Sequence, residues 1–353
     1  MSNIIAFNAP QRRLGFQDQA STLISLFATQ RRGADDVFWL KENAELLSIL
    51  ECSGTNMDAS ALEPLAEFYE TLPQRLSFFP QYYRFIVSIC LDLEDLGMAG
   101  TQGAKLCNWV AQQELAQAEL SDLQRGEAQR LLARRGVEFE DNGLNARLHR
   151  FISRNDTFAV PNKKAAYELT HIVFYLSEYG RKDPQLGNAA VRSLQFAGIL
   201  AYLDQNTDLL AEICIALRFA GHQPSQIWED HVTECLSDFA VEGASAVPAD
   251  DHYHEFLVAN WMALCAKRPV QHAQIRTGPM RFDRKNSTVG PLRAMSACMY
   301  QMREARSSDW HHMQGIIEQS VSPEGCEILR AAQDSSADFE MFFEGFSRMS
   351  IAG

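Results

Sequence analysis

An apolar helical segment that ends in a small residue recurs along the chain about every 42 residues. The small residue is Gly54, Gly97, Gly136, Gly180 and Gly221 in the first five segments, and Ala263 and Ala305 in the last two. The residues nine positions before them form a series with steps of 39 to 44 residues: Glu45, Ser88, Glu127, His171, Glu212, His254 and Ser296. Two helices and two turns fill such a length, so the series predicts about seven helical hairpins. Glycine at these positions predicts helix ends in the left-handed conformation.

The spacing of apolar residues predicts helices throughout the chain. Apolar side chains recur at intervals of three and four, the period of a helix with one buried face. No Asn-Gly or Asp-Gly turn joins two alternating segments, so strand signals are nearly absent. The sequence therefore predicts an all-α fold with helices at 63–76, 79–96, 165–179, 189–203, 209–219 and 253–266.

Hairpins that repeat at a constant period can be arranged in two ways. They can close into an α/α toroid, which we expect here, or stack as an open α-solenoid. Either arrangement accommodates 353 residues as one domain, although most single domains are shorter. Residues 1–20 are expected to form an N-terminal extension. Residues 267–291, which are rich in proline and glycine, are expected to form an irregular loop or a lid.

Composition and charge exclude several classes of protein. The net charge of −13 argues against nucleic-acid binding, and the basic cluster at 130–135 is interspersed with acidic residues, as on a solvated helix face. The eight cysteines form no CxxC pair and lie mostly in apolar helical segments, as buried thiols do in a reducing compartment. Residues 1–20 lack the apolar core of a signal peptide, and no apolar stretch is long enough for a membrane span. We expect a cytoplasmic protein.

Three consecutive members of the series are candidate metal ligands. If the hairpins close into a ring, His171, Glu212 and His254 lie at equivalent heights on neighbouring helices. Two imidazoles and one carboxylate bind zinc in many hydrolases and Fe(II) in many oxygenases. Each histidine stands in an apolar segment, where an unpaired polar group would be costly. The pattern predicts a Zn²⁺ or Fe²⁺ site, and hydrogen bonds within the core are the alternative explanation.

Three further polar residues flank the predicted ligands. Glu168 lies three residues before His171, and Asp208 lies four residues before Glu212, so each pair shares a helix face. Tyr175 lies one turn after His171. We expect Tyr175, Glu168 and Asp208 to act as acid–base groups or to orient the ligands.

Two resemblances accompany these residues. The series of helical hairpins resembles the α/α toroids of lanthipeptide cyclases and terpenoid cyclases. The lanthipeptide-cyclase-like toroids hold a zinc at one mouth with two cysteines and a histidine in glycine-rich motifs, and those motifs are missing here. The tract from Tyr167 to Tyr175, followed by Gly180, resembles a tract of uncharacterised bacterial domains, and this resemblance implies no activity.

These observations favour a metal-dependent enzyme that acts on a small metabolite or a peptide. The expected site is a cavity at one mouth of a helical toroid, without nucleic-acid or membrane partners, and a homodimer is left open. A non-catalytic helical-repeat scaffold that binds a partner protein on its concave surface is one alternative. A helical protein that binds haem or a hydrophobic ligand is the other.

Overall fold

The computed structural model describes residues 19–55, 57–243, 251–268, 275, 278–285 and 288–348. These residues form seventeen α-helices and one two-stranded sheet, which confirms the all-α prediction. Each of the six helices expected from the apolar spacing is present, with shifted ends. The predicted extension at 1–20 lies outside the described residues except for its last two positions.

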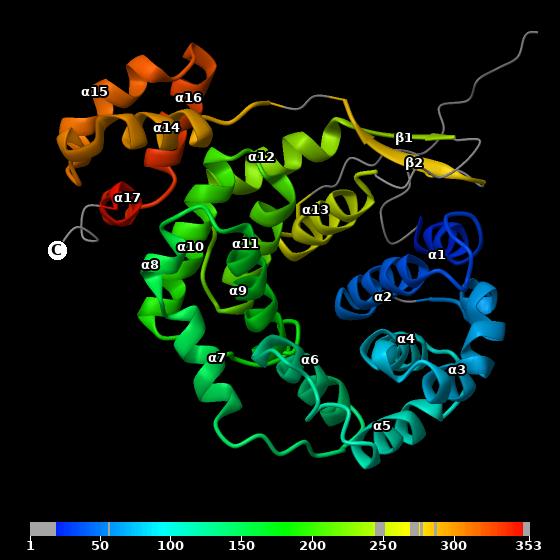
Figure 1. The fold of residues 1–353 in the computed structure, drawn as a ribbon. Coiled ribbons are helices and arrows are strands. Elements are labelled where there is room, and N and C mark those ends of the chain that lie inside the picture. Colours follow the sequence, from blue (N-terminus) through cyan, green and yellow to red (C-terminus); the bar gives the residue numbers. More distant parts are fainter. Residues whose placement is uncertain are drawn as a thin grey trace, which may run out of the picture.

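Six helices, which we call the ring helices, contact one another in cyclic order (Figure 1). Each contacts the next along the chain, and the last contacts the first. They carry the first six residues of the 42-residue series, one on each helix. The ring helices are α2 (Val37–Cys52), α4 (Tyr83–Asp95), α6 (Asp122–Ala133), α9 (Lys163–Leu176), α11 (Thr207–Phe219) and α13 (Tyr253–Cys265).

The intervening helices pack against the ring helices from outside (Figure 1). Within the described residues, three short 3₁₀ helices, Ala59–Leu65, Pro80–Tyr82 and Arg303–Ala305, complete the helical elements. In the described part of the chain, no helix combines the length and the apolar character that crossing a membrane requires. The outer helices are α1 (Ala20–Thr29), α3 (Ala66–Phe78), α5 (Gln102–Gln112), α7 (Leu144–Ile152), α8 (Asn155–Phe158), α10 (Asn188–Leu203) and α12 (Gln226–Ser237).

Glycines end the first five ring helices as the sequence predicts. Gly54, Gly97, Gly136, Gly180 and Gly221 all have positive φ, between 66° and 109°. At Gly180 a side chain is also excluded by space, because a Cβ there would lie 2.6 Å from the ring of Phe219. The sixth helix differs. Ala263 lies inside α13, and the left-handed residue that follows this helix is Lys267.

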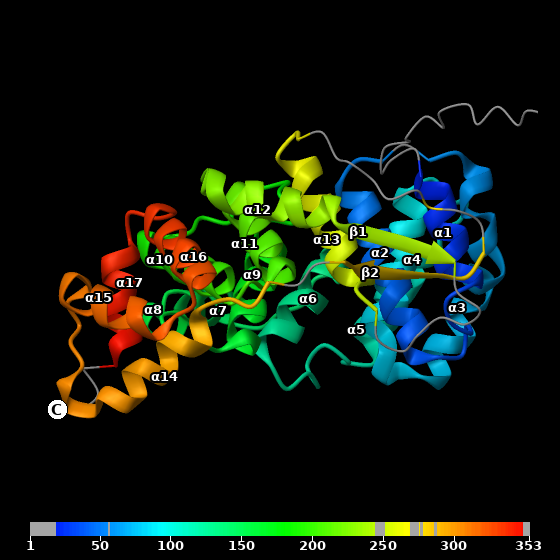
Figure 2. The same ribbon diagram turned by 90° about the horizontal axis from the view of Figure 1, so that it is seen from above.

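The last four helices form a group of their own beside α10 (Figures 1 and 2). They are α14 (Leu292–Met302), α15 (Trp310–Ser320), α16 (Pro323–Asp334) and α17 (Phe339–Ser347). Trp310 packs 5.0 Å from the ring centroids of both Phe339 and Phe343, so this group has an aromatic core. Ser296, the seventh member of the series, lies on α14, which packs against α15. The series therefore extends through six ring helices, and its seventh member belongs to the separate C-terminal group.

A small antiparallel sheet interrupts the helical pattern. Strand β1 (Phe239–Gly243) pairs with β2 (Met280–Arg284), which lies inside the segment that the sequence predicts to be irregular, 267–291. Phe282 is fully buried, 4.9 Å from the ring centroid of Phe256, and this packing stabilises the pairing. Residues 269–274, 276–277 and 286–287 lie outside the described residues, so a lid stays a prediction.

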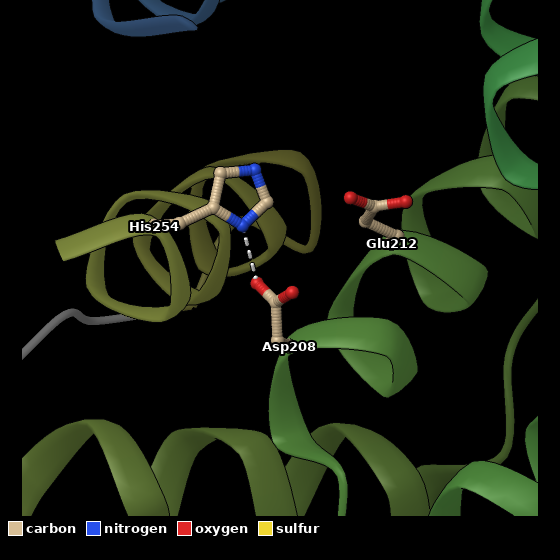
Figure 3. Close-up of side chains that lie close together, drawn as sticks. All are labelled: Asp208, Glu212 and His254. Atoms are coloured by element: carbon tan, nitrogen blue, oxygen red, sulfur yellow. Dashed lines mark hydrogen bonds and ion pairs between the residues drawn. The ribbon is translucent and has the colours of Figure 1, made fainter. Parts of the chain in front are cut away.

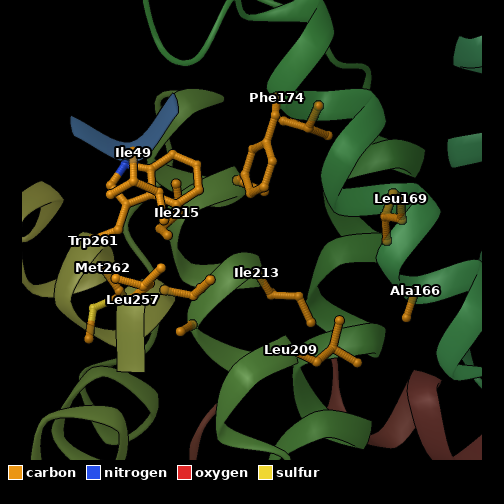
Figure 4. Close-up of a cluster of buried hydrophobic side chains, with 14 of the residues drawn as sticks. Ile49, Ala166, Leu169, Phe174, Leu209, Ile213, Ile215, Leu257, Trp261 and Met262 are labelled. Carbon is orange, nitrogen blue, oxygen red and sulfur yellow. The ribbon is translucent and has the colours of Figure 1, made fainter. Parts of the chain in front are cut away.

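An apolar cluster joins four of the ring helices (Figure 4). Phe174 of α9 and Trp261 of α13 lie 5.1 Å apart between ring centroids, beside Ile215 of α11 and Ile49 of α2. All four side chains are buried. Because protein cores are close-packed, this cluster fixes the relative positions of the helices that carry the candidate site.

The Trp228 side chain of α12 packs directly against Gly198 of α10. A Cβ at this position would lie 2.4 Å from the fully buried ring of Trp228. We expect Gly198→Ala to lower the free energy of unfolding by about 1–3 kcal/mol, because overpacking a core displaces neighbouring side chains. Urea unfolding measures this effect. Gly315→Ala on α15 is the matched control, since a Cβ there meets nothing within 4 Å, and equal effects of the two substitutions would contradict the prediction.

Candidate functional site

Two carboxylates and one imidazole converge between α11 and α13 (Figure 3). Asp208 and Glu212 lie one turn apart on α11, which begins at a cap where the Asn206 side chain accepts from the Leu209 amide. His254 lies at the start of α13. Within the described residues, Asp208, Glu212 and His254 form a group whose potential ligand atoms all lie within 4.8 Å of one another. We call these three residues the acid–histidine cluster.

His254 and Asp208 form a close pair. His254 Nδ1 donates to Asp208 Oδ1 at 2.7 Å, and the Tyr167 hydroxyl donates to the other oxygen at 2.7 Å. Burial lowers the pKa of His254, but Asp208 and Glu45 outweigh it and raise this pKa to about 10. Burial in turn raises the pKa of Asp208, but His254 outweighs it and holds this pKa below its usual value. In the absence of other ligands, the two groups are an ion pair at neutral pH.

Glu212 is the most buried member of the acid–histidine cluster. Its side chain is 3% exposed, and its Oε2 accepts a hydrogen bond from the Thr170 hydroxyl at 2.5 Å. His171 Nδ1 lies 3.7 Å from the same oxygen. Burial raises the pKa of Glu212, and His171 only partly opposes this shift. The site thus contains a carboxyl group whose negative charge is poorly compensated.

The structure places His171 beside the acid–histidine cluster and outside its group of three. His171 Nδ1 donates to the Tyr167 backbone carbonyl at 2.7 Å, so a neutral ring keeps its lone pair on Nε2. The side chain is 36% exposed. Glu168, which we expected to orient this ring, instead lies 3.9 Å from Lys164 Nζ. The Tyr167 carbonyl therefore orients His171.

Glu45 of α2 faces His254 of α13 across the contact between the first and the last ring helix. Its Oε1 lies 3.8 Å from His254 Nε2 and 2.7 Å from Lys41 Nζ, and its Oε2 accepts from the Tyr253 hydroxyl at 2.8 Å. The sequence identifies Glu45 only as the first member of the series. The contact between the first and last ring helices brings the first and sixth members of the series together. The expectation of a closed ring could therefore have identified Glu45 as a residue of the site.

The remaining candidate, Tyr175, lies one turn beyond His171 on α9. Its ring meets the His171 ring edge-on at 6.1 Å between centroids. Burial raises the pKa of Tyr175 well above its usual value, so its hydroxyl is protonated at neutral pH. Tyr175 lines a different cavity, between α6, α7 and α9. The candidates thus divide into three groups. Asp208, Glu212 and His254 form the acid–histidine cluster, His171 lies beside it, and Glu168 and Tyr175 are not part of it.

The acid–histidine cluster could hold a divalent cation. Ligand atoms that share a cation at metal–ligand distances of roughly 2.1 Å lie about 3 Å apart in an octahedral arrangement. The 2.7 Å between His254 Nδ1 and Asp208 Oδ1 is close to that value. Mixed carboxylate and imidazole ligands suit zinc, iron and manganese. A cation would replace the proton that His254 shares with Asp208.

The chain is thus an all-α protein whose ring helices carry a partly buried cluster of two acids and one histidine. The model of a protein family described as a domain of unknown function, DUF6902, matches residues 1–349, and the chain belongs to this family. No curated protein and no solved structure matches it. The expected membership of a domain family without an assigned activity is confirmed, and a relationship to the toroid cyclases stays a prediction.

Proposed function

We propose that the protein is a metal-dependent enzyme that binds one divalent cation between Asp208, Glu212 and His254 and acts on a small metabolite or a peptide. The convergence of these three side chains from two ring helices carries the proposal. The ligand set expected from the sequence changes in one place, since Asp208 takes the position assigned to His171. Zn²⁺ and Fe²⁺ stay the expected metals.

The charge balance around the acid–histidine cluster supports a bound cation. Three carboxylates, those of Glu45, Asp208 and Glu212, face the cations Lys41 and His254. Poorly compensated buried carboxylates are costly unless they are paired or coordinate a metal. A divalent cation would neutralise Glu212 and remove this cost.

The surrounding residues have separate roles in this proposal. A bound cation would activate water or polarise a substrate group. Tyr167 and Thr170 hold the two carboxylates by their hydroxyl hydrogen bonds, so the ligand atoms keep their positions. His171 offers a partly exposed Nε2 lone pair that can accept a proton from water or substrate beside the site.

Metal analysis of protein purified without a histidine tag tests this function. After loading with Zn²⁺, Mn²⁺ or anaerobic Fe²⁺ and removal of the excess, we expect about one equivalent of one of these metals, since a specific site saturates under excess metal. Asp208→Asn and Glu212→Gln are each expected to weaken metal binding at least about 100-fold, because each removes one of three protein ligands.

Glu168→Gln is the matched control for these two variants. It also removes one carboxylate, but its partner is Lys164, so metal binding should be unchanged. Less than about a tenth of an equivalent of each metal in the wild-type protein would refute the proposal, because excess metal fills even modest sites. Equal losses in Glu168→Gln and Glu212→Gln would also contradict it.

A second function, acid–base catalysis without a metal, is favoured by one observation. The 2.7 Å hydrogen bond between His254 and Asp208 resembles the pairing that orients a catalytic imidazole. In this function, His171 Nε2 and Glu212 exchange protons with the substrate. Wild-type protein that binds no metal would support this second candidate over the first. The convergence of the polar groups speaks for both enzyme functions over the alternatives of a repeat scaffold and a haem protein.

A further inference from the structure

A second cavity lies apart from the acid–histidine cluster. It has a volume of about 810 Å³, is open to solvent on one side, and is lined by residues of α6, α7, α9 and of the segments 136–140 and 182–185. None of the residues of the acid–histidine cluster lines it, whereas Tyr175 does. Small-molecule pockets typically have volumes of about 300–1,000 Å³, so the cavity can accommodate a metabolite-sized ligand.

Arg130 of α6 lines this cavity and lacks an ionic partner. The residue is only 7% exposed, and its Nε is buried without a hydrogen-bond partner. Over the described residues, no ion pair and no side-chain hydrogen bond of Arg130 is present, and its guanidinium carbon lies 4.3 Å from the centroid of the Tyr179 ring. Glu127, one turn earlier on the same helix, is bound by Arg84. Among the described residues, Arg130 is therefore a largely buried cation that contacts an aromatic face and pairs with no carboxylate.

The neighbouring arginines show that this arrangement is not general to the helix. Arg134 donates to Asp92 and Asp95, each at 2.7 Å, and Arg135 donates to Asp95 at 2.8 Å. Guanidinium groups cannot lose their proton in proteins, so a buried one without an anion costs several kcal/mol. A charged group in such an unfavourable environment, at the wall of a cavity, is a candidate for binding a ligand.

The lining of the cavity restricts the anion that Arg130 can bind. Glu138, Glu140 and Asp183 carry negative charges into the same lining, and Lys182 is paired with Glu178 at 2.6 Å. These negative charges would repel a polyanion such as a diphosphate or a nucleic acid. Apolar side chains, among them Val137, Leu148 and Leu176, complete the wall. The lining fits a ligand with a single carboxylate on an apolar, neutral or cationic body.

We propose that this cavity binds a small carboxylic acid and that Arg130 holds its carboxylate. The guanidinium can donate to both carboxylate oxygens in a bidentate pair while it stays stacked on Tyr179. The site does not depend on the metal proposed above, since the two groups of residues do not overlap.

Calorimetric titration of the full-length chain with benzoate tests the proposal, with benzamide as the uncharged probe of the same shape. We expect one benzoate to bind with a Kd of about 1 mM or tighter, and benzamide at least about tenfold more weakly, because only the anion pairs with the guanidinium. Arg130→Gln should lose at least about tenfold in benzoate affinity. Arg150→Gln, on the exposed side of α7, is the matched control and should bind as the wild type does.

Three outcomes would overturn the proposal. The first is that benzoate does not bind at concentrations up to 50-fold above the expected Kd of about 1 mM. The second is that benzoate and benzamide bind with equal affinity. The third is that phenyl phosphate binds more tightly than benzoate. Urea unfolding without ligand distinguishes a binding role from a structural one. A ligand-binding Arg130 predicts an unchanged or higher unfolding midpoint in Arg130→Gln, since unpaired charge is removed, whereas a structural arginine predicts a lower midpoint.

Discussion

Replacement of Arg31 by alanine is expected to lower the free energy of unfolding by about 3–5 kcal/mol, the range for removal of one partner from a buried ion pair. Arg31 follows α1, and its side chain is fully buried. Its Nε donates to Glu42 at 2.8 Å, and its two terminal nitrogens each donate to Asp251 at 2.9 Å. Alanine would leave Asp251, which is 1% exposed, without its bidentate partner.

The position of Arg31 makes this loss large. Glu42 belongs to α2 and Asp251 precedes α13, so Arg31 joins the first and last ring helices at the point of closure. Its guanidinium also lies 5.0 Å from the ring centroid of Phe27, 4.9 Å from that of Tyr253 and 5.4 Å from that of Phe282. A substitution here removes ionic, hydrogen-bonding and cation–π interactions together.

Chemical unfolding monitored by circular dichroism measures the effect of Arg31→Ala. Arg31→Lys keeps the charge but loses the bidentate geometry, so we expect a smaller loss than with alanine. Arg150→Ala removes an exposed arginine and should change the free energy of unfolding by less than about 0.5 kcal/mol. A loss below about 1 kcal/mol in Arg31→Ala would show that the closure does not depend on this residue.

The stability that His254 contributes is expected to depend on pH. Its pKa of about 10 in the folded protein exceeds the usual value of 6.5, so protonation favours folding. This contribution is fully present below pH 6.5 and is lost as the pH rises through 10. The lowered pKa of Asp208 keeps that carboxylate ionised until the pH falls below 3.8. The pair therefore stabilises the fold most between pH 3.8 and pH 6.5.

Unfolding of wild type and His254→Gln in the presence of a chelator measures this dependence. At pH 6 we expect a difference of roughly 2 kcal/mol, less than for a fully buried pair because both side chains keep some contact with solvent. The difference should narrow steadily toward pH 10. His222→Gln removes an exposed histidine and should show no such trend. A difference that is constant with pH would mean that His254 acts only through packing.

The sequence predicts the helices and the region of the site because both follow from local periodicity. The constant step of the series places Glu212 and His254 on neighbouring ring helices, and the structure brings them together. The i, i+4 relation of Asp208 to Glu212 places both on one face of α11, but periodicity does not indicate that both carboxylates belong to the same group of ligand atoms.

Interactions between distant segments explain what the sequence does not predict. Strands β1 and β2 are 36 residues apart, and each becomes a strand only through the other. Glu45 reaches His254 only because α13 contacts α2. Likewise, nothing in the local pattern distinguishes α14 from a seventh ring helix. It packs against α15, a later segment whose Trp310 packs in turn against Phe339 of α17.

Cyclic contact among the ring helices has a consequence for how the fold is lost. In an open helical array the end repeats have only one neighbour, so they fray first and need polar caps. Here each ring helix has a neighbour on both sides, and Arg31 joins α2 to α13, the two ring helices that lie furthest apart in the chain. Loss of the contact between α2 and α13 would leave each of these helices with one neighbour among the ring helices, and α13 carries His254. Stability and site assembly are therefore coupled through the contact between α2 and α13, two helices that lie far apart in the chain.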